Sequence, residues 1–162
     1  MEIAAWEEGA VGRSTLVRID DSDLWSLPEV LALVIAPALR KLREVQCGSS
    51  FVEDEDVPPR LRSGRVGEPD AWAAPDDNWA PRWHWILDEM IWTFEQLAQP
   101  DLRRQYYSGQ IDIQWEPIPN SDMQKMRLGP EHTLNFDEVD RYDARVSNGL
   151  RLFARYYRCL WE

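Results

Sequence analysis

Apolar residues recur every three or four positions in three parts of the chain, at 27–46, 81–98 and 136–160. This spacing is typical of helices that bury one face. Two short stretches, 14–20 and 111–116, predict strands, and in the second of them apolar and polar residues alternate. We therefore expect one domain, 1–162, with a mainly helical α+β fold, in which three principal helices surround one core and the two strands pair.

The first predicted helix is apolar on nearly all sides. Residues 30–39 contain no polar side chain, and Arg40 is the first charged residue after them. A helix of this kind is generally well buried. Residues 26–29 (Ser-Leu-Pro-Glu) fit a capping box, Pro37 predicts a kink, and Gly48 is the expected end of the helix.

The second predicted helix carries large aromatic side chains on two faces. Its core face is expected to comprise Trp83, Ile86, Leu87, Met90, Ile91, Phe94 and Leu97. The opposite face holds Trp85 and Trp92 among the carboxylates of Asp88 and Glu95. A helix with large aromatic side chains on both faces is usually buried on both faces or uses the second face to bind a partner, so we expect a homo-oligomer.

The last predicted helix has an apolar face and an arginine face. The apolar face is expected to comprise Val139, Tyr142, Val146, Leu150, Phe153, Tyr157 and Leu160. Gly149 lies on that face, where the missing side chain would let another helix approach closely. The opposite face carries Arg141, Arg145, Arg151, Arg155 and Arg158.

Residues 48–81 predict a long, acidic, proline-rich loop inside the domain. The acidic tetrad 53–56 (Glu-Asp-Glu-Asp) is followed by Val-Pro-Pro, and nothing in the stretch is periodic. The tetrad lacks the alternating ligands and turn glycine of a calcium loop, so we expect a solvated, charged loop. Residues 101–108 predict a short helix, and 120–135 an irregular segment.

The charge of the chain excludes one class of partner. Its 162 residues carry 18 Lys and Arg against 29 Asp and Glu, which gives a net charge of −11. Extended DNA or RNA is not an expected ligand, because that affinity comes mainly from neutralising phosphates. Two cysteines form neither a disulfide framework nor a metal motif. No membrane span and no signal peptide is recognised, so we expect a cytoplasmic protein.

The arginine face admits two interpretations. The guanidinium groups pair with the chain's own carboxylates, either on the second helix (Asp88, Glu89, Glu95) or on the last one. Alternatively they bind a compact anion, since the arginine fork matches phosphate oxygens and some of the nine tryptophans could stack a base. The residues proposed for such a ligand site are Arg145, Arg151, Arg155, Trp85, Trp92 and Tyr156.

Catalytic signals are weak. His84 and His132 are the two histidines, and His84 lies one helical turn from Asp88. Carboxylates on two helices could hold Mg²⁺, as in all-α nucleotide pyrophosphohydrolases, but only Asp-x-x-Asp spacings occur (137–140 and 140–143) and no Glu-x-x-Glu. We assign no catalytic residue, metal ligand or cofactor, and leave open whether the chain is an enzyme.

Four segments carry a resemblance to known proteins: LALVIAPALRKLREV, VEDEDVPPRLRS, RWHWILDEMIWTFEQL and RVSNGLRLFARYYRCLWE. Together they resemble a family of small tailed-bacteriophage proteins with no assigned function, over about half of the chain. The resemblance implies a setting in the cytoplasm of an infected bacterium and assigns no residue a role.

Three functions follow from these patterns. The first is a phage-encoded binding protein that sequesters a nucleotide-type immune signal in an Arg/Trp pocket. The second is an acidic inhibitor or accessory factor that binds a basic host or phage protein, since the charge would steer association. The third is a Mg²⁺-dependent nucleotide pyrophosphohydrolase. An arginine face filled by internal carboxylates favours the second function, and an open one favours the first.

Overall fold

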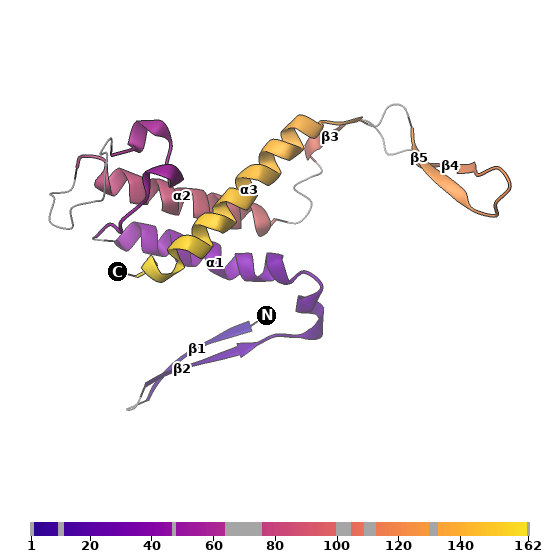
Figure 1. Ribbon diagram of the computed structural model, residues 1–162. Helices are drawn as coiled ribbons and strands as arrows, with labels where there is room; N and C mark the ends of the chain where they lie inside the picture. Colours follow the sequence, from indigo (N-terminus) through magenta and orange to yellow (C-terminus); the bar gives the residue numbers. More distant parts are fainter. Residues whose placement is uncertain are drawn as a thin grey trace. The chain divides into compact units, whose positions relative to one another are not determined.

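The computed structural model describes residues 2–9, 12–46, 48–63, 76–99, 105–108, 113–129 and 133–161. In this part of the chain there are three α-helices, α1 (Leu27–Val45), α2 (Trp79–Leu97) and α3 (Phe136–Tyr156), and small antiparallel strand pairs (Figure 1). The predicted α+β, mainly helical fold is confirmed. The chain divides into two compact units, Met1–Pro100 with Gly149–Glu162, and Asp101–Asn148.

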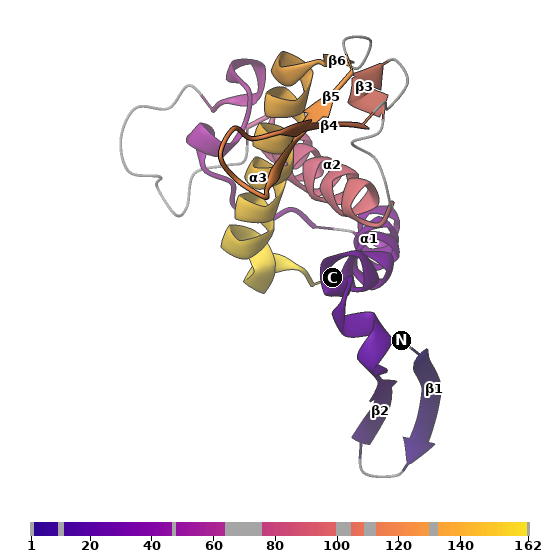
Figure 2. The same ribbon diagram turned by 90° about the vertical axis from the view of Figure 1, so that its right-hand side faces the viewer.

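The strands form three separate two-stranded sheets among the described residues. In the first unit β1 (Glu2–Gly9) pairs with β2 (Gly12–Arg18). In the second unit β3 (Tyr107–Ser108) pairs with β6 (Thr133–Leu134), and β4 (Ile113–Pro117) pairs with β5 (Gln124–Leu128) (Figure 2).

The predicted strands exist, but the expected pairing of 14–20 with 111–116 is wrong. Each pairs with a strand close to it in sequence instead, and such hairpins close a far shorter loop at a lower cost in entropy. The irregular segment expected at 120–135 contains β5 and β6. The helix expected at 101–108 is replaced at its end by β3, and residues 101–104 lie outside the described part of the chain.

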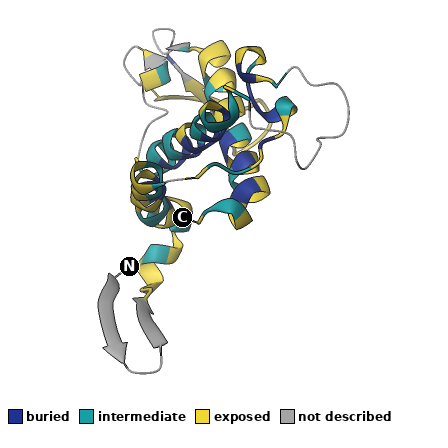
Figure 3. Cartoon of the chain, turned by 90° about the vertical axis from the view of Figure 1, so that its left-hand side faces the viewer, coloured by how far each residue is buried: buried dark blue, intermediate teal, exposed yellow. Residues whose placement is uncertain are grey.

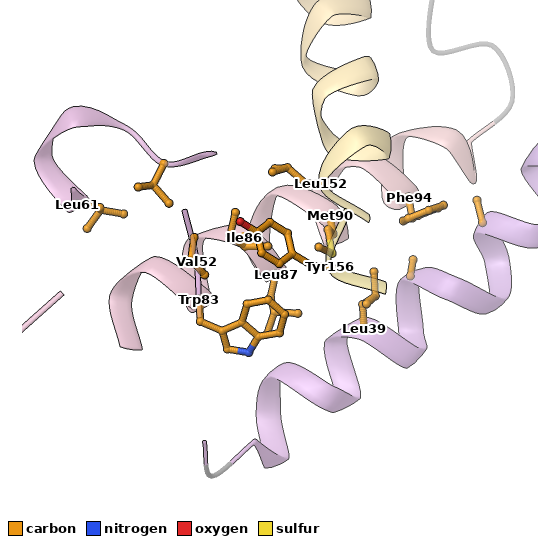
Figure 4. Packing of buried hydrophobic residues seen from close by; sticks show 13 residues of the cluster. Leu39, Val52, Leu61, Trp83, Ile86, Leu87, Met90, Phe94, Leu152 and Tyr156 are labelled. Atoms are coloured by element: carbon orange, nitrogen blue, oxygen red, sulfur yellow. The ribbon is translucent and has the colours of Figure 1, made fainter. Parts of the chain in front are cut away.

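The core of the first unit is built around α2. The side chains of Trp83, Ile86, Leu87 and Met90 are fully buried there, Phe94 is 5% exposed, and Ile91 and Leu97 pack against them, as the periodicity predicts. The other buried apolar residues are Ala32, Ala36 and Leu39 of α1, Leu152 and Tyr156 of α3, and Val52, Val57 and Leu61 of the acidic segment (Figures 3 and 4).

The burial expected for α1 is wrong. Ala32, Ala36 and Leu39 are its buried residues, while Leu31 is 43% and Leu33 61% exposed. The cause is that α2 packs along one side of α1, so the apolar residues on the outer side have no cover among the described elements. The capping box is also not formed, because the side chain of Ser26 makes no capping hydrogen bond.

The apolar face expected for α3 is rotated in the structure. Gly149, Leu152 and Tyr156 are the buried residues, whereas Leu150 is 41% and Tyr157 62% exposed. The close approach predicted at Gly149 is confirmed, and it explains the rotation. A Cβ built on Gly149 would lie 2.7 Å from the Cβ of Thr93, so α3 turns its smallest residue towards α2 where the two helices cross (Figure 1).

Candidate functional site: the acidic segment and the arginines of α3

The described part of the predicted loop, residues 48–63, is built into the core. It contains two 3₁₀ turns, Asp54–Asp56 and Pro59–Leu61. Val52 and Val57, on either side of the first turn, are each less than 5% exposed. The expectation of a solvated loop is therefore wrong for this part, because apolar residues flanking the acidic tetrad anchor it.

Two residues hold this segment in place through hydrogen bonds: Ser63 within the segment and Arg82 from α2. The backbone N–H of Ser63 donates to Asp54 Oδ1 at 2.8 Å, and its hydroxyl donates to Oδ2 at 2.7 Å. Burial raises the pKa of Asp54, but these two hydrogen bonds and the positive charges of Arg82 and Arg62 together outweigh it and leave the pKa below its usual value. The buried guanidinium of Arg82 donates to the Leu61 carbonyl at 3.1 Å and to both oxygens of Asp76 at 3.0 and 3.1 Å.

The carboxylate of Asp56 is the centre of a buried polar cluster. Its side chain is 1% exposed, and it accepts two hydrogen bonds and makes one further ion pair with residues of α3. Arg151 Nη1 donates to Oδ1 at 2.6 Å, the Tyr156 hydroxyl donates to Oδ2 at 2.6 Å, and Arg155 Nη1 lies 3.0 Å from Oδ2. We call Asp56, Arg151, Arg155 and Tyr156 the Asp56 cluster. Its geometry satisfies the main requirement for a buried charge, which is pairing and hydrogen bonding.

Tyr156 joins this cluster to the apolar core. Its hydroxyl also accepts the backbone N–H of Glu53 at 3.2 Å, and its ring packs edge-on against Trp83 with 5.9 Å between centroids (Figure 4). Burial, with the hydrogen bond to Asp56, raises the pKa of Tyr156 well above its usual value. The side chain is therefore a neutral donor at physiological pH.

Arg155 bridges two carboxylates of the tetrad. Besides Asp56 it binds Glu55 Oε1 at 2.6 Å, and its guanidinium carbon lies 6.0 Å from the centroid of the Tyr156 ring. The hydrogen bond to Glu55 raises the pKa of Arg155 further. Two arginines of this face, Arg151 and Arg155, are thus paired from within the chain, with carboxylates 95 and 100 positions away.

The carboxylates of α2 are engaged by α1 instead. Arg40 Nε donates to Glu95 at 2.7 Å, and Arg43 Nε donates to Asp88 at 3.1 Å. Burial, together with the nearby Arg43 and against the opposing effect of Asp88, lowers the pKa of His84. One of the two pairings expected from the sequence joined the α3 arginines to Asp88, Glu89 and Glu95, and it is wrong for Asp88 and Glu95, which pair with α1.

The structure brings together three of the six proposed ligand residues: Arg151, Arg155 and Tyr156. Trp85 is half-buried on α2 and packs against the core. Trp92 is also half-buried on α2, and Arg145 is an exposed residue of the second unit. The aromatic residue that contacts the Asp56 cluster is Trp83.

The carboxylates of Glu55 and Asp56 belong to this site and were not among the proposed ligand residues. The signal available was the tetrad itself, since adjacent carboxylates repel one another and this repulsion falls when cations lie nearby. Among the described residues, no group of three or more His, Cys, Asp or Glu gathers as a metal site. His132 lies outside them.

A second candidate surface is the hairpin of β4 and β5. All five residues of β4 are exposed. Ile113, Trp115 and Pro117 alternate with polar residues, and Trp115 lies directly opposite Met126. Because neighbouring residues of a strand point to opposite sides, one side of the hairpin is apolar and the other is polar. On the polar side Arg127 pairs with Glu116 at 2.8 Å.

No protein-family model, curated protein or solved structure matches the chain. Among its described helices, none is long and apolar enough to cross a membrane.

Proposed function

We propose that this protein acts by binding a partner protein, and that the apolar side of the β4–β5 hairpin is its contact surface. One observation carries the proposal: Ile113 is 48%, Trp115 59% and Met126 52% exposed, although all three lie on the same side of one small sheet. Monomeric proteins rarely expose grouped large apolar side chains without a role in binding. Tryptophan and methionine are also enriched at the centres of protein interfaces.

The stability of the hairpin supports the same proposal. An isolated two-stranded hairpin is marginal in water and normally needs a surface to pack against. Its apolar side is available for this role, because the polar side already holds an ion pair between Glu116 and Arg127. A partner with an apolar groove would bury Trp115 and Met126 together as one cross-strand pair.

The Asp56 cluster favours a protein partner over a nucleotide. Arg151 and Arg155 are held by Asp56 and Glu55, so their charge is already balanced within the chain and attracts a phosphate less strongly than free arginines would. The net charge of −11 further favours a partner whose groove is bordered by basic groups. The resemblance to tailed-bacteriophage proteins supports a partner in the infected host, so we propose an accessory factor or inhibitor acting there.

The test compares two exposed tryptophans. Tagged wild-type protein, Trp115→Ala and Trp161→Ala are used to capture partners from bacterial lysate at low and high salt, and the captured protein is then purified and titrated against each variant. Trp161 is 68% exposed and lies outside the hairpin. We expect Trp115→Ala to weaken binding by roughly 30-fold or more, as truncation of a central aromatic does, and Trp161→Ala to leave it unchanged.

Two results would contradict this proposal. Equal binding by wild type and Trp115→Ala would remove the hairpin from the interface. A rise in melting temperature with cyclic or ADP-ribose-type nucleotides that Arg151→Ala abolishes would show instead that the arginines bind a ligand, because a ligand of the folded state stabilises it.

A further inference from the structure

Met126 is a methionine on the apolar side of the β4–β5 hairpin, and its thioether is open to reagents in solution. The residue is 52% exposed and lies directly opposite Trp115. Met90 of α2, by contrast, is fully buried in the core. Oxidation of a methionine requires access to its sulfur, so Met126 is expected to react much faster than Met90.

The pairing of β4 with β5 brings Met126 close to Trp115. The backbone N–H of Ile118 donates to the Met123 carbonyl at 3.1 Å, so these two opposite residues form a hydrogen-bonded pair. Hydrogen-bonded and non-hydrogen-bonded pairs alternate along an antiparallel ladder. Trp115 and Met126 lie three positions further along and are therefore a non-hydrogen-bonded pair, the kind in which side chains lie closest together. A chemical change at the sulfur of Met126 thus alters the surface around Trp115.

We propose that Met126 is a modification site, at which oxidation by a peroxide releases the partner protein. The inference rests on the proposed function, because it concerns the same contact surface. In this step the thioether sulfur attacks one oxygen of hydrogen peroxide, the O–O bond breaks and an S=O bond forms. The sulfur loses two electrons, and the other oxygen leaves as water with both protons.

The product explains why binding is lost. Oxidation converts an apolar thioether into a polar sulfoxide. A partner groove that covers Trp115 and Met126 together must then take the sulfoxide oxygen out of water. An apolar groove offers this oxygen no hydrogen bond, and burying an unpaired polar group is costly.

Met123 is a control within the same hairpin. It is 67% exposed, more than Met126, and is expected to be oxidised as readily. Because neighbouring residues of a strand point to opposite sides, Met123 lies on the other side of the hairpin from Met126 and Trp115. Its oxidation is therefore expected to leave binding unchanged.

The experiment treats wild type, Met126→Leu and Met123→Leu with hydrogen peroxide and maps the sulfoxides by mass spectrometry. The binding probe is the protein that wild type captures and Trp115→Ala does not, and each variant is compared with its own untreated form. Oxidation is expected to weaken binding by wild type and Met123→Leu roughly 10-fold or more, and to leave Met126→Leu unaffected. Methionine sulfoxide reductases A and B, one for each epimer, are expected to restore binding.

Three results would overturn the proposal. The first is a Met126 that is oxidised no faster than the buried Met90, and this result needs no partner. The second is an equal loss of binding by oxidised wild type and oxidised Met126→Leu, because another residue is then responsible. The third is full binding by oxidised wild type, which leaves the proposed function standing, since that function is tested by Trp115→Ala.

Discussion

Replacing Asp56 by alanine is the most informative test of how the first unit is held together. The substitution leaves the apolar core as it is and removes the acceptor that Arg151, Arg155 and Tyr156 share. Asp56 is the buried carboxylate of the tetrad, and its side chain is 1% exposed. The loss therefore falls on a desolvated site.

The expected cost can be worked out from the three contacts. The hydrogen bond from the buried Tyr156 hydroxyl ends on a charged group, which is worth roughly 1.5–3 kcal/mol. Arg151 and Arg155 are 47% and 37% exposed, so water can solvate them after the change and each pair contributes at most about 1 kcal/mol. We expect Asp56→Ala to lower the free energy of unfolding by about 3 kcal/mol, within the range for one partner of a buried ion pair.

Glu55→Ala is the matched control, because it removes the same charge from the adjacent residue. Its side chain is 71% exposed and pairs with Arg155, so we expect a loss of no more than about 1 kcal/mol. Urea unfolding followed by circular dichroism measures both variants. In a chain of this length, 3 kcal/mol corresponds to a fall of roughly 6–12 °C in melting temperature.

One comparison decides whether the reasoning holds. If Asp56→Ala and Glu55→Ala are equally mild, the cluster does not hold the acidic segment against α3. The same conclusion follows if Asp56→Leu is more stable than Asp56→Ala by the full 3 kcal/mol, since the volume of the side chain would then matter and its charge would not.

Three further predictions follow from the same unit. Gly149→Ala should destabilise the fold by roughly 1–3 kcal/mol through overpacking. Adding Thr93→Ala should recover part of the loss, because it removes the clashing Oγ1, which has no hydrogen-bond partner, but keeps the Cβ 2.7 Å away. A double-mutant cycle of unfolding measures the recovery. Since the pKa of Tyr156 is raised in the fold, the contribution of this side chain to the free energy of unfolding is complete below its unfolded pKa of 10.0 and is lost as the pH rises above that value. Tyr156→Phe should therefore reduce the fall in stability with pH above 10.0. An unchanged slope in this range would argue against the burial of a neutral hydroxyl. Arg82→Lys should cost about 2 kcal/mol in urea unfolding, because lysine cannot reproduce the forked contacts to Asp76 and the backbone.

How far the sequence predicts this fold depends on what covers each helix. The face of α2 could be predicted because α2 is the central helix, so its periodic apolar residues all meet other elements. The apolar pattern does not predict the burial of α1, because it shows that a residue such as Leu33 is hydrophobic but not whether another element packs against it. In α3 the close approach at Gly149 could be predicted, but the apolar spacing also put Leu150 and Tyr157 on the buried face, and both are exposed.

The Asp56 cluster could be predicted only in its parts. An arginine face and an acidic tetrad are both visible in the sequence, but their meeting is a contact across about 100 residues. Helical spacing relates Arg151 to Arg155 and says nothing about distant partners. The apolar residues Val52 and Val57 on either side of the tetrad were the available sign that the segment turns inward.

The same contacts show where a function should be sought. The carboxylates of the acidic tetrad repel one another, and folding against Arg151 and Arg155 reduces that repulsion by pairing Glu55 and Asp56 with both arginines. A phosphate that took both guanidinium groups away from Asp56, 1% exposed, would leave a buried carboxylate without its cations, and that state costs several kcal/mol. An anion therefore competes poorly for this part of α3. Binding is favoured most at surfaces where large apolar side chains are exposed to water, because covering them lowers the free energy without breaking any internal ion pair. Two such surfaces are the β4–β5 hairpin around Trp115 and the outer face of α1 around Leu33.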